Sequence, residues 1–257
     1  IGPLNSELHK ILIRFLLSRI TIIYARDIVS YELAKKLFGS ERTVLCPDVG
    51  TMSSNNKFNH QVKDNNQTIT RVGIALSSPI SEIIQINSLK DSIYESIVNS
   101  TNPNNVELQI LPSNYSKSGE SDDYVHCKKL HSDLINAGFK ARILDNNIIE
   151  PDDYAQHLLG LDYFISTRMH VAILSTSLCV PTIVINTQHK IRGYMELINM
   201  QDCVVEIVDI NPNLSKLIKL FDNHDYRLRL KDRLKNENIN CKKKVISALE
   251  LSVKYVL

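Results

Sequence analysis

Arg168 and His170 are the residues of this chain best suited to chemistry, because they stand two positions apart between an expected strand at 163–166 and an expected helix at 170–178. The N–H groups at a helix start favour an anion, and a guanidinium and an imidazole beside them suit a phosphate or a carboxylate. The spacing therefore predicts an anion site. A simpler explanation stays open: Arg168 would pair with a nearby carboxylate, and His170 would donate to a backbone carbonyl.

Further polar residues follow other expected strands, which is where ligands bind in an open parallel sheet. Arg26 and Asp27 follow residues 20–25, Asp48 follows residues 43–46, and Ser77 and Ser78 follow residues 72–76. Asp27 is equally well explained as the N-cap of the next helix, and Asp48 and the serines as turn residues. We take Arg26 as a candidate site residue, and Asp48, Ser77 and Ser78 as candidates to line a cleft.

The remaining histidines and the cysteines predict no metal site. The five cysteines are widely and irregularly spaced without a Cys-x-x-Cys pair, which fits neither a disulfide framework nor a zinc site. We expect them to be small buried residues. Four histidines in polar or helical surroundings are expected at the surface or hydrogen-bonded within the fold: His60, His126, His131 and His157.

The composition excludes several classes of protein. A content of 43% hydrophobic and 23% charged residues is typical of globular domains. Thirty basic residues against 28 acidic ones give a net charge of +2, which offers no electrostatic support for nucleic-acid binding. No apolar stretch approaches the roughly 18 residues of a membrane span. Three lysines at 242–244 are expected at a helix start, either solvated or against an anionic membrane surface.

The order of expected elements predicts an α/β fold with a parallel sheet. After a segment rich in Asn, Ser and Lys at 51–70, short apolar strands alternate with helical stretches, which is typical of a doubly wound, Rossmann-like domain. We expect strands at 72–76, 106–111, 141–144, 163–166, 182–186 and 204–208, and helices at 83–98, 124–137, 151–159 and 170–178. Neither GxGxxG nor GxxxxGK[ST] occurs, so a nucleotide held by a glycine-rich turn is not expected.

The chain is expected to divide into two parts, residues 1–66 and residues 67–257. The first part is predicted to hold a helix at 8–17, a strand at 20–25, a helix at 30–38 and a strand at 43–46. Because the chain opens at Ile1 rather than at a methionine, we interpret this part as the end of a first Rossmann-like domain. Helices are expected after the sheet, with Val245, Ile246, Leu249 and Val253 on one common face.

The series of motifs resembles the polysaccharide pyruvyl transferase family. An Arg26-Asp27-x-x-Ser30 element is followed by Pro47-Asp48, then by a strand that ends in Arg168-Met169-His170, then by a Val180-Pro181 strand and a Lys190-x-x-Gly193 segment. The family has a strand ending in Arg-Leu-His that opens a helix, with a Val-Pro strand and a Lys-x-x-Gly segment after it. Residues 162–193 carry the most specific part of the resemblance.

The resemblance implies a fold like that of GT-B glycosyltransferases, with the active site between two Rossmann-like halves. Members transfer the enolpyruvyl unit of phosphoenolpyruvate to a sugar, forming a pyruvate ketal and releasing phosphate, without a further cofactor or a metal. It implies a cytoplasmic protein, at the inner face of the membrane where the saccharide acceptor is lipid-linked. The residues expected to bind phosphoenolpyruvate are Arg26, Arg168, Met169, His170 and Lys190, with His170 as the acid and Arg168 stabilising charge.

Two departures from the family pattern keep alternatives open. The family's Asn-x-Gly-Asp loop has no counterpart here, and Pro112 is followed by Ser113 where members often have a histidine. One alternative is a GT-B glycosyltransferase that uses a nucleotide sugar. The other is a noncatalytic binding relative that keeps the fold.

Overall fold

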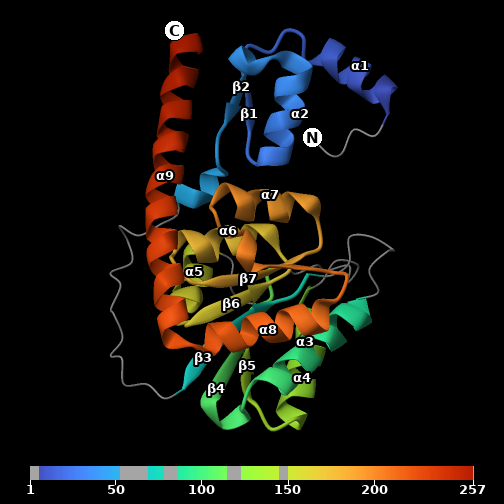
Figure 1. The fold of residues 1–257 in the computed structure, drawn as a ribbon, viewed down its shortest axis with the longest axis vertical. Coiled ribbons are helices and arrows are strands. Elements are labelled where there is room, and N and C mark those ends of the chain that lie inside the picture. The colour runs from blue at the N-terminus through green and yellow to red at the C-terminus, as the bar shows by residue number, and fades with distance from the viewer. Residues whose placement is uncertain (1–5, 53–68, 78–85, 115–122, 145–149, 257) are drawn as a thin grey trace.

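A six-stranded parallel sheet forms the centre of the protein (Figure 1). The computed structural model describes residues 6–52, 69–77, 86–114, 123–144 and 150–256. The strands lie side by side in the order β5-β4-β3-β6-β7-β8, which is the 3-2-1-4-5-6 order of a doubly wound Rossmann sheet. Their bounds are β3 Thr70–Ala75, β4 Val106–Ile110, β5 Lys140–Ile143, β6 Tyr163–Ser166, β7 Thr182–Asn186 and β8 Val204–Glu206.

Helices cover both faces of this sheet, as the alternating pattern predicts. Figure 1 shows α5, α6 and α7 on one face and α3, α4 and α8 on the other. The edge of Tyr163 from β6 packs against Phe221 of α8, with ring centroids 5.4 Å apart. The bounds are α3 Ile86–Ser100, α4 Asp123–Asn136, α5 Pro151–Leu159, α6 Met169–Ser177, α7 His189–Leu197 and α8 Ile210–Asp222. The α/β, Rossmann-like class is confirmed.

The N-terminal part is a small α/β unit with a two-stranded parallel sheet. It consists of α1 Glu7–Leu16, β1 Ile23–Ala25, α2 Ile28–Phe38 and β2 Thr43–Leu45, followed by the short 3-10 helix η2 Val49–Met52. The predicted strand at 20–25 is too long, because only its last three residues pair. Arg42 donates to the Ser18 and Ile20 carbonyls and so holds the preceding residues in a turn. The predicted boundary at 66/67 lies outside the described residues.

The N-terminal part packs on the helices that begin after β6 and β7. A Cβ on Gly193 of α7 would lie only 3.2 Å from Asp27 Cβ, and a Cβ on Gly50 would lie 3.3 Å from Ile173 of α6. The two glycines thus let the backbone of the two parts approach closely. Short 3-10 helices complete the described elements: η1 Ser40–Arg42, η3 Pro103–Asn105 and η4 Gln201–Cys203.

The long helix α9, His224–Val256, runs beside both parts (Figure 1). Tyr24 of β1 donates to the Ala248 carbonyl at 3.1 Å and shares a hydrogen bond with the Ser252 hydroxyl at 2.7 Å. One expectation for this region is wrong, because lysines 242–244 lie inside α9 rather than at a helix start. Of the residues expected on one common face, Ile246, Leu249 and Val253 are exposed and Val245 is buried, because α9 packs through Cys241, Val245 and Ala248.

None of the helices in the described ranges is long and apolar enough to cross a membrane.

Gly73 in the middle of β3 provides a test of the packing. A Cβ there would overlap Leu161 Cδ1 and lie 2.6 Å from Phe164 Cδ2, both in the tightly packed cluster under α5. We expect Gly73→Ala to lower the free energy of unfolding by about 1–3 kcal/mol, the usual cost of overpacking a core. Gly160→Ala is the matched control, because its Cβ would meet only the His157 carbonyl at 3.8 Å. Equal denaturation midpoints for the two variants would contradict the packing described.

Candidate functional site

The candidate site lies where β3 and β6 run side by side and the direction of the chain across the sheet reverses. In doubly wound sheets, ligands bind in the crevice outside this switch point. The Ser77 N–H after β3 donates to Thr167 Oγ1 after β6 at 2.7 Å, and the two hydroxyls are 3.0 Å apart. Both residues are buried. Ser77 therefore lies at the switch point, bonded to Thr167, whereas Ser78 lies outside the described residues.

Arg168 occupies the N-cap position of α6 and is fixed from both ends. The Ser166 hydroxyl accepts a hydrogen bond from the Arg168 N–H at 3.1 Å. The guanidinium binds Asp123 with both arms, Nε to Oδ2 at 3.0 Å and Nη2 to Oδ1 at 2.5 Å. Ser113 donates to the same carboxylate at 3.1 Å. Arg168 thus has the carboxylate partner that the simpler explanation requires, while 21% of its side chain stays exposed and its Nη1 arm makes no bond described here.

Asp123 is the site residue that the sequence did not reveal. It is fully buried at the first position of α4, on the opposite side of the switch point from α6. An acid at the start of an expected helix is normally explained by capping, so its type alone points to no site. Its role follows from the sheet order, which brings the end of β4 and the following helix near the end of β6.

His170 and Met169 form the first turn of α6 but face different surroundings. His170 is exposed, and within the described parts of the chain no hydrogen bond or ion pair holds its imidazole. The alternative in which it donates to a backbone carbonyl is therefore not observed there. Met169 is only 5% exposed and its side chain belongs to the main core, which leaves its backbone for the predicted ligand contact. Successive residues of a helix point in different directions, and the first turn of α6 directs the Met169 side chain inward.

Lys190 stands in the first turn of α7, and the start of α7 lies beside the start of α6. Thr187 after β7 donates to the Thr167 carbonyl at 3.1 Å, which ties the two strand ends together. Neither α6 nor α7 has an acidic residue in its first turn or a side-chain cap. Two helix N-termini with uncompensated positive ends therefore open at one edge of the sheet, with Arg168, His170 and the half-buried Lys190 around them.

Arg26 pairs with an acidic residue of its own N-terminal part. Its Nη1 donates to Asp48 Oδ2 at 2.9 Å, and 40% of its side chain is exposed. The other Asp48 oxygen accepts from the Gly50 N–H at 3.0 Å, so Asp48 is both a turn residue and the partner of Arg26. Asp27 caps α2, accepting from the Ser30 N–H and hydroxyl at 2.8 Å each. Arg26 is thereby placed one residue from the contact between Asp27 and α7.

The remaining histidines and cysteines form no site in the described ranges. His131 contacts the Ala141 carbonyl at 3.2 Å and His157 contacts Gln109 at 3.0 Å, as expected for structural histidines, while His60 lies outside the described residues. No group of residues described in the structure could hold a metal ion. The cysteines are free thiols, four of them buried, and burial raises the pKa of Cys241 to about 11.

Comparison with protein families identifies the family of this chain. The profile of polysaccharide pyruvyl transferases matches residues 1–189. The chain belongs to the polysaccharide pyruvyl transferase family. The matched region contains Arg26, Asp48, Arg168 and His170 and ends one residue before Lys190. No curated protein sequence shows significant similarity to this family member.

Solved structures confirm the GT-B-like fold. A glycosyltransferase from Rickettsia africae is similar with a TM-score of 0.60 at 11% identity, over 98% of this chain and 67% of that one. A structure of accessory secretory proteins 1, 2 and 3 of Streptococcus pneumoniae gives 0.59 at 12% identity, over 96% and 46%. S. aureus MnaA with UDP gives 0.57 at 10% identity, over 90% and 57%. The chain thus spans about half to two thirds of the length of these three structures.

The Arg168–Asp123 pair is testable as a unit. Removing one member leaves a buried or half-buried charge without its partner, and breaking such pairs costs about 3–5 kcal/mol. We expect Asp123→Ala to lower the free energy of unfolding by about that amount, and the double variant with Arg168→Ala to recover at least about 1 kcal/mol in a double-mutant cycle. Ser113→Ala, which removes a neutral hydrogen bond to the same carboxylate, should cost only about 1 kcal/mol. Strictly additive effects would show that the pair is not coupled.

Proposed function

We propose that this member of the polysaccharide pyruvyl transferase family transfers the enolpyruvyl unit of phosphoenolpyruvate to a saccharide, forming a pyruvate ketal and releasing phosphate. The observation that carries the proposal is the arrangement at the switch point. Arg168 is held rigidly by buried Asp123, and the exposed His170 stands beside it on the first turn of α6. The pre-organised guanidinium of Arg168 and the exposed imidazole of His170 suit a reaction on a small, highly charged donor.

The anionic donor would be bound by the positive groups around the crevice. Phosphoenolpyruvate carries a phosphate and a carboxylate on a three-carbon frame, so it needs several positive contacts close together. The N-termini of α6 and α7, the free arm of Arg168, and Lys190 supply them from the C-terminal domain. Arg26 supplies one from the N-terminal part, where Asp48 holds it. Met169 contributes only its backbone N–H to this arrangement, since its side chain is buried.

The proposed chemistry assigns the proton transfer to His170. His170 donates a proton to C3 of phosphoenolpyruvate, which makes C2 electrophilic. A hydroxyl of the acceptor adds to C2 and returns a proton to His170. The bond between C2 and the phosphate oxygen then breaks, with its electron pair leaving on phosphate. A second hydroxyl adds to C2 and gives its proton to the departing phosphate, which completes the ketal. Arg168 stabilises the charge on the departing phosphate. The donor is consumed, and no further cofactor enters the scheme.

We propose that the acceptor is a cell-surface polysaccharide or its lipid-linked precursor. A lipid-linked acceptor would place this cytoplasmic reaction at the inner face of the membrane. Lysines 243 and 244 are exposed on α9 and would be available for contact with anionic lipid.

We also propose that residues 1–66 form one portion of an N-terminal Rossmann-like half and residues 67–257 the C-terminal half. Two observations support this division. The sheet of β1 and β2 has only two strands, fewer than an isolated sheet needs for stability. No residue of α1 is buried, although Leu8, Ile11, Leu12, Phe15 and Leu16 form one continuous apolar stripe. Further strands and helices of the same half would cover these surfaces.

A second candidate function is glycosyl transfer from a nucleotide sugar. It is favoured by the fold shared with a glycosyltransferase from Rickettsia africae and with S. aureus MnaA bound to UDP. The absence of a glycine-rich phosphate loop in the sequence argues against it. A noncatalytic relative is the remaining alternative, and the Arg168–His170 pair argues against that one.

One assay separates these functions. Full-length protein is incubated with phosphoenolpyruvate and a lipid-linked or nitrophenyl sugar, and phosphate release is followed together with the mass gain of a pyruvate ketal. We expect both signals to rise together. Turnover of a nucleotide sugar without any product from phosphoenolpyruvate would replace the first function by the second. Binding of the sugar without turnover of either donor would support the noncatalytic relative.

The role of His170 has its own test. His170→Ala should lower kcat/KM for transfer about 10²–10⁴-fold, the usual contribution of a general acid, and leave the thermal unfolding midpoint nearly unchanged because the side chain is exposed. His224→Ala is the control, an exposed histidine at the start of α9. A large loss of stability in the first variant would instead indicate a structural histidine.

The domain proposal is tested on α1. In full-length protein Phe15→Ala should lower the free energy of unfolding by about 3 kcal/mol, as for a buried aromatic residue, although Phe15 is 77% exposed in the part of the chain described. His9→Ala on the polar side of the same helix should change it by less than about 0.5 kcal/mol. Equal small effects would show that the apolar stripe of α1 stays in solvent.

A further inference from the structure

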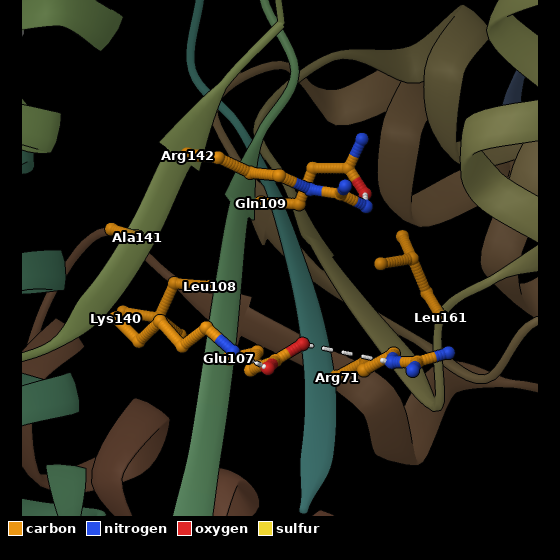
Figure 2. Close-up of a pocket in the computed structure, with 8 residues that line it drawn as sticks. All are labelled: Arg71, Glu107, Leu108, Gln109, Lys140, Ala141, Arg142 and Leu161. Carbon is orange, nitrogen blue, oxygen red and sulfur yellow. Dashed lines mark hydrogen bonds and ion pairs between the residues drawn. The ribbon is translucent and has the colours of Figure 1, made fainter.

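A pocket with charged residues at its rim lies on the sheet, away from the switch point. It has a volume of about 250 Å³ and is lined by Arg71, Glu107, Leu108, Gln109, Lys140, Ala141, Arg142 and Leu161 (Figure 2). It exists because α5 covers only one end of β3, β4 and β5. The apolar cluster under α5 contains Ala75, Leu111 and Leu144, which stand at or just beyond the carboxyl ends of these strands. Within the described ranges, no helix covers the amino-terminal halves of these strands on this face.

The side chains on this open face form two rows across the strands. Strand register places Arg71, Glu107 and Lys140 opposite one another, and Gln109 opposite Arg142. Neighbouring strands are about 4.8 Å apart, so side chains in a row reach each other. In the first row Glu107 lies 3.7 Å from Arg71 and also pairs with Lys140 (Figure 2). These cations lower the pKa of Glu107, mainly through the Lys140 hydrogen bond, and keep it ionised.

The second row leaves a cation without an acidic partner. Arg142 donates to Gln109 Oε1 at 2.9 Å, and the Gln109 amide nitrogen lies 3.0 Å from His157 Nδ1. Burial lowers the pKa of His157, and the nearby charge of Arg142 lowers it further. The imidazole is therefore neutral at neutral pH and leaves the charge of the pocket unchanged. In the described ranges no carboxylate pairs with Arg142. Among the described residues that line the pocket, three cations therefore face one carboxylate, which leaves two net positive charges.

We propose that this pocket binds a small sugar phosphate. The phosphate would be held by Arg142 and Lys140, since a guanidinium binds phosphate with two parallel hydrogen bonds and an ammonium adds charge. The sugar hydroxyls would donate to ionised Glu107 and bond to the amide of Gln109, over the apolar side chain of Leu161 at the edge of the pocket. The volume is smaller than that of pockets for drug-sized ligands, which suits one phosphorylated monosaccharide. This inference does not rest on the proposed transfer reaction.

Calorimetric titration with glucose 6-phosphate tests the proposal on the whole protein. We expect saturable binding that weakens at least about tenfold in the double variant Arg142→Gln, Lys140→Gln, because both exposed cations are lost without disturbing the core. Lys219→Gln, on the exposed side of α8, is the matched control and should keep the affinity of the natural sequence. Glucose and inorganic phosphate, titrated separately, should each bind more weakly than glucose 6-phosphate.

The same titration in Arg168→Gln distinguishes the pocket from the switch point. Affinity for glucose 6-phosphate should be retained in this variant, whatever becomes of pyruvyl transfer. No binding to the natural sequence, or equal binding to the double variant, would overturn the proposal. Loss of binding in Arg168→Gln alone would place the phosphate at the switch point and would also overturn it. Equal affinity for inorganic phosphate would overturn the part played by the sugar.

Discussion

The pairing of β3 with β6 is the constraint on which the candidate site depends. These strands are far apart in the chain, yet Val72 stands opposite Tyr163 and Ala75 opposite Ser166. Once this register is set, Ser77 and Thr167 meet at the strand ends and Arg168 begins α6 at the same edge. The first half of the sheet then grows in one direction and the second half in the other, which opens a crevice between them. A one-residue slip would turn Arg168 away from Asp123, because successive side chains point to opposite faces.

The N-terminal part lies against α6 and α7 through close backbone contacts. Gly193 and Gly50 permit the approach, and the side chain facing Gly193 is the capping carboxylate Asp27. The glycine of the Lys190-x-x-Gly193 segment therefore serves the contact between the two parts. Of the neighbours Arg26 and Asp27, the first pairs with Asp48 and the second caps α2. The α9 helix adds a second connection through Tyr24.

The sequence predicted what depends on local pattern and missed what depends on contacts between distant segments. Alternating strands and helices were sufficient for the doubly wound class, and strand ends placed Arg168 and His170 at the switch point, where the structure has them. Asp123 was invisible, since 45 residues separate it from Arg168 and the sheet order alone brings them together. The direction of the Met169 side chain into the core was also missed, because it depends on the helical turn. The lysines inside α9 looked like a helix start because the apolar residues that continue the helix on both sides are widely spaced.

The two cationic regions of the sheet differ in how their charge is held, and this difference fits different tasks. At the switch point a wholly buried carboxylate fixes Arg168 in one geometry, and the helix starts add partial charges that do not move. Stabilising a transient charge requires such fixed groups, since no energy is then spent on reorganising them during the reaction. On the open face, Lys140 and Arg142 are exposed on an edge strand, and their partners are a shared carboxylate and a neutral amide. Such side chains exchange partners readily and suit reversible binding of a ligand that comes and goes unchanged, so the rigid site is the one that fits catalysis.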